Sequence, residues 1–147
     1  MSGLPERLQD ATQSGAYRAL RDDELLAAAE GARIDFARIT LADVRDKAAL
    51  LAQVAAALGF PRWFGANWDA LEDCLTDLSW REARAHLLLF EGFEALRDAS
   101  GDDFGVLLDV LGSSAAYWAE RGRPFFAVFV DPGQRLALPE LSAGQAP

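Results

Sequence analysis

The sequence is poor in the side chains on which much enzyme chemistry depends. It holds one cysteine, one histidine and one lysine in 147 residues. A single Cys74 excludes an internal disulfide, and His86 alone leaves a zinc cage or a Ser/His/Asp site without enough members. Lys47 is not preceded by a glycine-rich run, so no phosphate-binding loop of the GxxxxGK type is present.

Long apolar runs and basic residues are also scarce. No uninterrupted stretch reaches the roughly 18 apolar residues of a membrane span, and the first residues lack the cationic start and apolar core of a signal peptide. The chain carries 23 acidic and 14 basic side chains, for a net charge of −9 and a pI near 4.5. We therefore expect a cytoplasmic protein with no membrane or nucleic-acid partner, because both of those partners attract basic surfaces. A basic protein is the better expectation.

The composition is that of one globular domain, with 51% hydrophobic and 25% charged residues. We expect the main domain over residues 33–132. Residues 1–32 form an N-terminal extension that offers an extra strand at 16–20 and a short helix at 22–30. Residues 133–147 are rich in Pro, Gly, Ala and Ser, and we expect a mobile tail there.

Strand and helix patterns alternate along the main domain. Residues 33–41, 85–91 and 125–130 read as strands, and the last two are continuous apolar runs typical of a parallel sheet covered on both faces. A helix begins after the N-cap Asp46 and stops at Gly59, and another spans the apolar repeat from Phe104 to Trp118. The fold class predicted is α/β, a small parallel sheet of three strands, or four if residues 16–20 join, packed by helices.

The segment from Asn67 to Leu78 predicts a short helix with an acidic face. At about 100° per residue, Glu72, Asp73, Thr76 and Asp77 fall within roughly 80° of Asp69. The apolar residues fall opposite, and Asn67 is the natural N-cap. The segment contains no Lys or Arg, although mixed charge would relieve the repulsion between Asp69 and Asp73 at i,i+4.

Three interpretations of these carboxylates remain open from the residues alone. Asp69 in the first turn complements the helix dipole, and the remaining acids form an ordinary solvated face. Alternatively, the acidic face binds a basic partner. A metal-dependent hydrolase that uses Asp69 and Asp73 is a third reading, but other segments supply no supporting ligands, so no metal or cofactor is expected. We expect Cys74, on the apolar side, and His86, in a buried strand, to be structural.

The run from Phe64 to Thr76, Phe-Gly-Ala-Asn-Trp-Asp-Ala-Leu-Glu-Asp-Cys-Leu-Thr, resembles the signature of the barstar family of ribonuclease inhibitors. The resemblance extends over roughly residues 33–132, and the family's small parallel sheet packed by helices agrees with the element order above. It implies a non-enzymatic, cytoplasmic inhibitor, monomeric when free, that binds one guanyl-specific microbial ribonuclease and blocks its active site. A non-nuclease basic partner is the alternative, because inhibitors can be repurposed.

The resemblance also implies which residues bind the partner. Asp73 matches the acid that enters the phosphate-binding pocket of the nuclease, and Asp69 matches a second pairing acid one turn earlier. Trp63 stands where an aromatic packs on the mouth of the active site. The complete expected surface is Trp63, Phe64, Gly65, Asn67, Asp69, Glu72, Asp73, Thr76 and Asp77.

Some positions depart from the family pattern. Arg62 is basic where an acidic or neutral residue suits a basic partner better, and Glu72 replaces an aromatic. Tyr117 and Arg121 stand where the founding member has glutamates. These departures leave the acidic face intact but leave the identity of the ribonuclease open.

Overall fold

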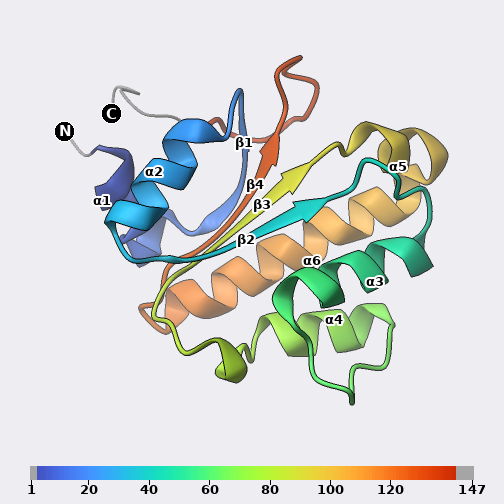
Figure 1. The fold of residues 1–147 in the computed structure, drawn as a ribbon, viewed down its shortest axis with the longest axis horizontal. Helices are drawn as coiled ribbons and strands as arrows, with labels where there is room; N and C mark the ends of the chain where they lie inside the picture. Colours follow the sequence, from blue (N-terminus) through green and yellow to red (C-terminus); the bar gives the residue numbers. More distant parts are fainter. Residues whose placement is uncertain (1–2, 142–147) are drawn as a thin grey trace.

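Four parallel strands form a single sheet in the order β1-β4-β3-β2 (Figure 1). The protein is represented by a computed structural model that describes residues 3–141. The strands are β1 (Gly15–Ala19), β2 (Asp35–Thr40), β3 (His86–Glu91) and β4 (Phe125–Val130). The predicted fold class is confirmed. The fourth strand, β1, comes from the N-terminal segment and pairs with β4, at the edge opposite β2.

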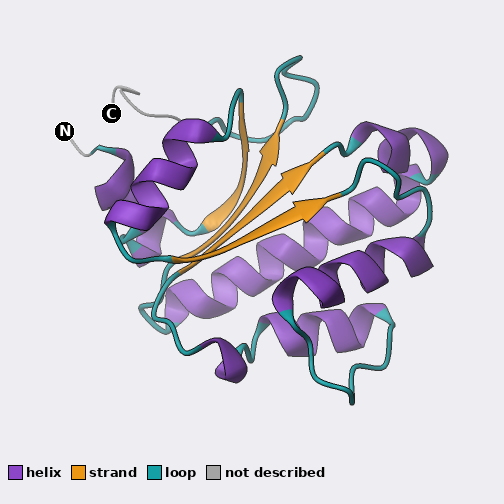
Figure 2. Ribbon diagram, in the orientation of Figure 1, coloured by secondary structure: helices purple, strands orange, loops and turns teal. Residues whose placement is uncertain are grey.

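Helices cover both faces of the sheet (Figure 2). One face is covered by α1 (Leu4–Leu8) and α2 (Asp23–Gly31), and the other by α3 (Lys47–Leu58), α4 (Trp68–Leu75), α5 (Glu94–Ala99) and α6 (Gly101–Glu120). Short 3-10 helices, η1 (Ala11–Gln13) and η2 (Ser79–Arg81), lie in the connections. Because α3 packs on β2 and α6 on β1 and β4, while α4 packs on α6, α4 lies in the layer farther from the sheet (Figure 1).

The apolar runs of the central strands supply two separate cores. Leu88 and Phe90 of β3 face the α3 and α6 side, whereas Leu87 and Leu89 face α1 and α2. Successive side chains of a strand point to opposite faces, so a strand covered on both sides must be apolar at every position. This explains the continuous runs that the sequence shows at residues 87–90 and 125–129.

Both ends of α3 match the sequence signals. An Asp46 carboxylate oxygen accepts a hydrogen bond from the Ala49 N–H at 2.8 Å. Gly59 ends the helix in the left-handed region, with φ of 65°, which a residue without a Cβ adopts at little cost. The prediction of this helix is confirmed, and α3 delivers the chain to the loop that precedes α4.

The segment after β4 differs from the expected mobile tail. The Arg18 N–H donates to the Pro139 carbonyl and the Leu141 N–H donates to the Arg18 carbonyl, both at 2.9 Å. Leu136 and Leu141 are buried, in different cores. Residues 136–141 are therefore packed against the domain because their leucines complete its cores. The remainder of the expected tail, 142–147, lies outside the described residues.

Burial of Leu141 gives a direct test of this packing. The side chain is fully buried beside α1 and α2, so Leu141→Ala should lower the free energy of unfolding by about 2–5 kcal/mol. Leu20→Ala is the control, because Leu20 is 40% exposed and should change stability by only about 0.5 kcal/mol. Urea denaturation measures both. Equal, small losses in the two variants would show that residues 136–141 do not pack as described.

Candidate protein-binding site

The helix α4 begins at a side-chain cap and buries one face completely. The Asn67 side-chain oxygen accepts a hydrogen bond from the Ala70 N–H at 2.7 Å, as the sequence predicts. Leu71, Cys74 and Leu75, which share one side of the helix, are fully buried. Burial of a leucine side chain contributes about 1.5–3 kcal/mol, so these contacts fix the orientation of the helix.

The end of α4 differs from the prediction. We expected the helix to reach Leu78, but it ends at Leu75, and Leu78 adopts a left-handed conformation with φ of 51°. The Thr76 hydroxyl donates to the Glu72 carbonyl at 2.8 Å, and the Trp118 indole N–H donates to the Leu75 carbonyl at 2.8 Å. The Glu72 carbonyl also accepts the Thr76 N–H at 2.9 Å, whereas the Trp118 bond satisfies a carbonyl that the helix terminus leaves without a backbone partner. Asp77 therefore lies in the turn that follows the helix.

Four carboxylates face the solvent at this site: Asp69, Glu72, Asp73 and Asp77, which we call the acidic face. Within residues 3–141, none of the four forms an ion pair with a Lys, Arg or His side chain. Like charges at i,i+4 cost only about 0.2–0.5 kcal/mol, less than the burial of one leucine gains. The apolar side of α4 therefore holds the acidic face in place despite its internal repulsion.

The loop of residues 59–67 precedes the acidic face and presents the other predicted partner-binding residues. Trp63 is 60% exposed, and Gly65 and Asn67 are also exposed. Phe64 is half-buried, with its ring edge against Phe60 at 5.0 Å between centroids. The loop and α4 thus bring the predicted residues onto one continuous segment. Thr76 differs from the others because its hydroxyl is used within the helix.

Two of the departures from the barstar pattern lie at the end of α6 and contact each other. The Arg121 guanidinium stacks over the Tyr117 ring at 3.5 Å from its centroid, and it donates to the Tyr117 carbonyl at 2.8 Å. The other two departures are also exposed: Arg62 lies in the loop next to Trp63 in the chain, and Glu72 lies on the acidic face.

Cys74 and His86 occupy structural positions, as their patterns suggest. Burial raises the pKa of the Cys74 thiol, and the charges of Asp77 and Asp73 raise it further. A thiol with a raised pKa is a poor nucleophile. His86 is buried at the start of β3 and has one polar partner there. Its Nδ1 lies 2.8 Å from an Asp35 carboxylate oxygen.

Asp35 joins His86 to Arg81 in a cluster that the sequence analysis missed. Arg81 donates from Nε and Nη2 to the two Asp35 oxygens, at 2.6 and 2.9 Å. Asp35 and His86 are the first residues of neighbouring strands and pair directly in register. The one available signal was that an acid and a histidine each open a predicted strand, but the pairing of those strands was needed to connect them.

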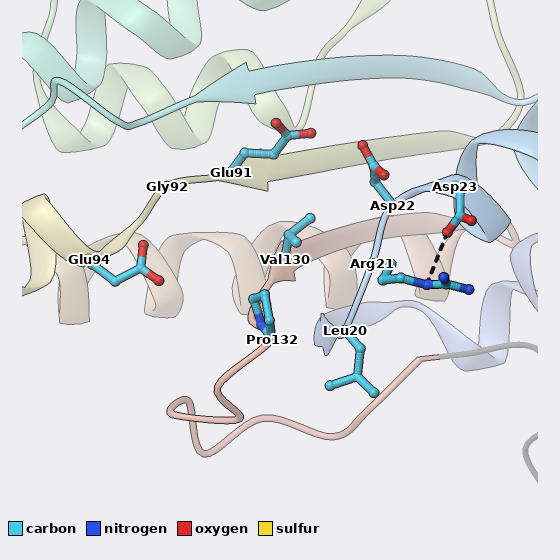
Figure 3. Close-up of a pocket in the computed structure, with 9 residues that line it drawn as sticks. All are labelled: Leu20, Arg21, Asp22, Asp23, Glu91, Gly92, Glu94, Val130 and Pro132. Atoms are coloured by element: carbon cyan, nitrogen blue, oxygen red, sulfur yellow. Dashed lines mark ion pairs between the residues drawn. The ribbon is translucent and has the colours of Figure 1, made fainter.

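The carboxyl ends of β1, β3 and β4 surround a hollow, drawn in Figure 3. Ligands of parallel α/β folds often bind at this edge of the sheet. Several carboxylates line the hollow, but arginines pair with most of them. Arg38 bridges Asp22 at 3.1 Å and Glu91 at 2.9 Å, and Arg21 approaches Asp23 at 3.5 Å. The hollow is therefore closer to charge balance than the acidic face.

Within the described part of the chain, no group of three or more His, Cys, Asp or Glu side chains is arranged to hold a metal ion. Residues 3–141 also contain no helix with the length and apolarity needed to cross a bilayer.

The described residues form an α/β domain whose acidic face has no ion-pair partner among them and follows a loop with an exposed tryptophan. A family model described as Barstar (barnase inhibitor) matches residues 34–130, more than half of the 147-residue chain. The chain belongs to the barstar family, and the predicted resemblance is confirmed. This is an inhibitor family, named for its action on the ribonuclease barnase.

Comparison with solved structures supports the fold alone. The structure of the Aeropyrum pernix ORC2 protein, in ADPNP and ADP complexes, aligns with a TM-score of 0.50 at 16% sequence identity. The alignment covers 87% of this chain but only 38% of the ORC2 chain. No curated protein matches the sequence significantly.

The Asp35 cluster predicts how stability depends on pH. Burial lowers the pKa of His86, with help from Arg81 and Arg123, and outweighs the opposing effect of Asp35. Burial raises the pKa of Asp35, but the hydrogen bonds and charges of Arg81 and His86 outweigh it, so the net pKa is lowered. The charged groups of the hollow that His86 lines are Asp77, Glu82, Arg84 and Arg123.

Proton binding determines whether the free energy of unfolding rises or falls with pH. His86 takes up a proton at higher pH in the unfolded chain than in the folded one, so stability is complete above the ordinary histidine pKa of about 6.5 and falls as the pH drops below it. Asp35 adds a similar loss in the ordinary range of aspartate, near pH 4. Urea unfolding of the wild type should therefore show stability falling between pH 7 and 5.5, and His86→Gln should remove that slope. An unchanged slope in the variant would contradict the assignment.

Proposed function

We propose that this protein inhibits a small, guanyl-specific microbial ribonuclease by occupying its cationic active site with the acidic face and the tryptophan loop. Membership of the barstar family supports this proposal. The observation that carries it is the exposure of Asp69, Glu72, Asp73 and Asp77 without ion-pair partners within residues 3–141. The complex has one copy of each protein, and the inhibitor acts without catalysis in the cytoplasm, where it protects the cell from the nuclease.

The chemistry of RNA cleavage explains why carboxylates suit this task. A ribonuclease stabilises a phosphodiester whose negative charge increases in the transition state, so its cleft gathers cationic side chains. Carboxylates accept charge-assisted, bidentate hydrogen bonds from guanidinium groups, as phosphate oxygens do. The acidic face thereby replaces the RNA backbone without offering a bond that the enzyme can cleave.

Asp73 is the central residue of the proposed interface. It lies on the exposed side of α4, between Asp69 one turn earlier and Asp77 in the following turn. Trp63 and Phe64 supply apolar area beside the charged centre, where they exclude water and slow dissociation. An interface of this kind buries about 1,600 Å² in total.

Charge also controls the rate of association. The net charge of −9 attracts a basic nuclease over a distance that salt shortens. We expect the association rate constant to fall steeply between about 0.02 and 0.5 M NaCl while the dissociation rate constant changes less. Stopped-flow mixing with a ribonuclease that this protein is found to inhibit measures both rate constants. An association rate that is insensitive to salt would contradict electrostatic steering.

The role of Asp73 is tested by two isosteric variants, each of which removes one negative charge at a different place. Asp73→Asn should weaken binding to the ribonuclease by at least about 2 kcal/mol, because the partner's cations are left desolvated without a counter-charge. Glu30→Gln is the matched control, because Glu30 is exposed on α2, on the opposite face of the sheet. Isothermal titration calorimetry against a panel of small ribonucleases gives both affinities.

The outcomes separate the proposal from its rivals. Equal losses in the two variants would place the interface elsewhere. Inhibition of no ribonuclease in the panel, combined with capture of a basic non-nuclease protein that depends on Asp73, would favour the other binding function.

A further inference from the structure

The last carbonyl of α3 is held by two side chains from a distant part of the chain. The Leu58 carbonyl accepts hydrogen bonds from the Trp80 indole N–H at 2.9 Å and from Arg81 Nη1 at 3.2 Å. Helix-terminal carbonyls lack partners within the helix, so these donors satisfy an acceptor that water would otherwise take. We call Trp80 and Arg81 the clasp. The loop of residues 59–67, which carries Trp63, begins immediately after this carbonyl.

Trp80 also supports the first half of the loop through ring contacts. Its ring meets the Phe60 ring edge-on at 5.9 Å between centroids, and Phe60 in turn meets Phe64 at 5.0 Å. Edge-to-face pairs of this kind contribute beyond their buried area. Phe60 and Phe64 flank Trp63 along the chain, and ring contacts connect both of them to Trp80. Trp63 itself is 60% exposed.

Arg81 connects the clasp to the sheet. Its guanidinium makes two bonds to Asp35, the first residue of β2, while its remaining Nη1 reaches Leu58. His86 of β3 approaches the same Asp35 carboxylate at 2.8 Å, so Asp35 is fixed from both sides. The planar guanidinium spans both acceptors in a fixed geometry, which a flexible ammonium does not.

The opposite end of the loop is fixed separately. The Asn67 cap holds the start of α4, and the Trp68 ring lies under the Lys47 ammonium at 5.8 Å. Two anchored ends leave the exposed Trp63 in a defined place relative to the carboxylates of α4. Such preorganisation reduces the conformational entropy that is lost when a partner binds.

We propose that Trp80 and Arg81 are positioning residues for partner binding, which hold the loop of residues 59–67, and with it Trp63, in its binding orientation. They act through the Leu58 carbonyl and Phe60 and need not touch the partner. This inference rests on the proposed function for its consequence in affinity. Its structural part, the hold on the loop, does not depend on any partner.

The test uses two variants and one matched control. Trp80→Phe keeps a ring against Phe60 but removes the N–H, and Arg81→Met keeps an apolar stem but removes every bond to Asp35 and Leu58. Arg18→Met is the control. Arg18 likewise bonds a carboxylate, Glu140 at 2.9 Å, and a carbonyl, Leu138 at 3.0 Å, and its side chain is 19% exposed against 20% for Arg81.

Trypsin reports on the loop without any partner, because Arg62 is exposed and immediately precedes Trp63. Cleavage after Arg62 of the folded protein, followed by mass spectrometry, should accelerate about 2- to 12-fold in Trp80→Phe and in Arg81→Met. This is the change in an equilibrium that the loss of one hydrogen bond produces, and each variant loses one bond to the Leu58 carbonyl. The Kd for the ribonuclease should increase by a similar factor. Arg18→Met should leave both quantities within twofold of the wild type, even where its unfolding midpoint falls as far as that of Arg81→Met.

Each contrary outcome has a distinct meaning. Unchanged cleavage after Arg62 in both folded variants would overturn the hold on the loop. Faster cleavage with an unchanged Kd would overturn the positioning role, and equal effects in Arg18→Met would reduce it to general stability. If the wild type inhibits no ribonuclease, the proposed function fails, and with it the effect on affinity, while the trypsin result still decides whether the clasp holds the loop.

Discussion

The burial of one side of α4 is the constraint on which the site depends. Leu71, Cys74 and Leu75 are completely removed from water, and this packing determines that the carboxylates at Asp69 and Asp73 point outward. The like charges of the acidic face repel each other weakly, and the burial of the apolar side outweighs this repulsion. Packing in the folded protein therefore holds in place an acidic face whose like charges would weaken an isolated helix.

For the proposed inhibition, the orientation of α4 matters because the acidic face has to match fixed cations in the ribonuclease. The Trp118 indole holds the carboxyl end of α4 through the Leu75 carbonyl, and Asn67 holds its amino end. Electrostatic attraction between preorganised groups loses little to reorganisation on binding. The same logic extends to the loop before α4, whose start is fixed by bonds to the Leu58 carbonyl.

Local signals in the sequence were sufficient for most of the fold. The apolar runs at 85–91 and 125–130 and the signals at Asp46, Gly59 and Asn67 each depend on near neighbours, and the corresponding elements are β3, β4, α3 and α4. The end of α4 was placed three residues too late because periodicity alone does not register the Thr76 hydroxyl bond or the left-handed Leu78. The burial of Leu136 and Leu141 was missed because composition does not reveal which core a leucine completes.

The parts that the sequence did not reveal join distant segments. Arg81 is 46 residues from Asp35 and 23 from Leu58, and these pairings depend on the order of the strands and on the path of α4. The acidic face, in contrast, lies within one helix and the turn after it, so helical spacing predicted its exposure. Its role in binding was a prediction from the resemblance and remains a proposal.

We propose that the acidic face takes the place of RNA in the cleft of the ribonuclease. The most direct measurement is the steady-state inhibition of a ribonuclease that this protein binds, at several concentrations of an RNA substrate. We predict competitive inhibition, in which the apparent KM rises with inhibitor concentration while kcat is unchanged, because both ligands require the same cationic cleft. A decrease in kcat with an unchanged KM would show that inhibitor and RNA bind together, and would contradict the account.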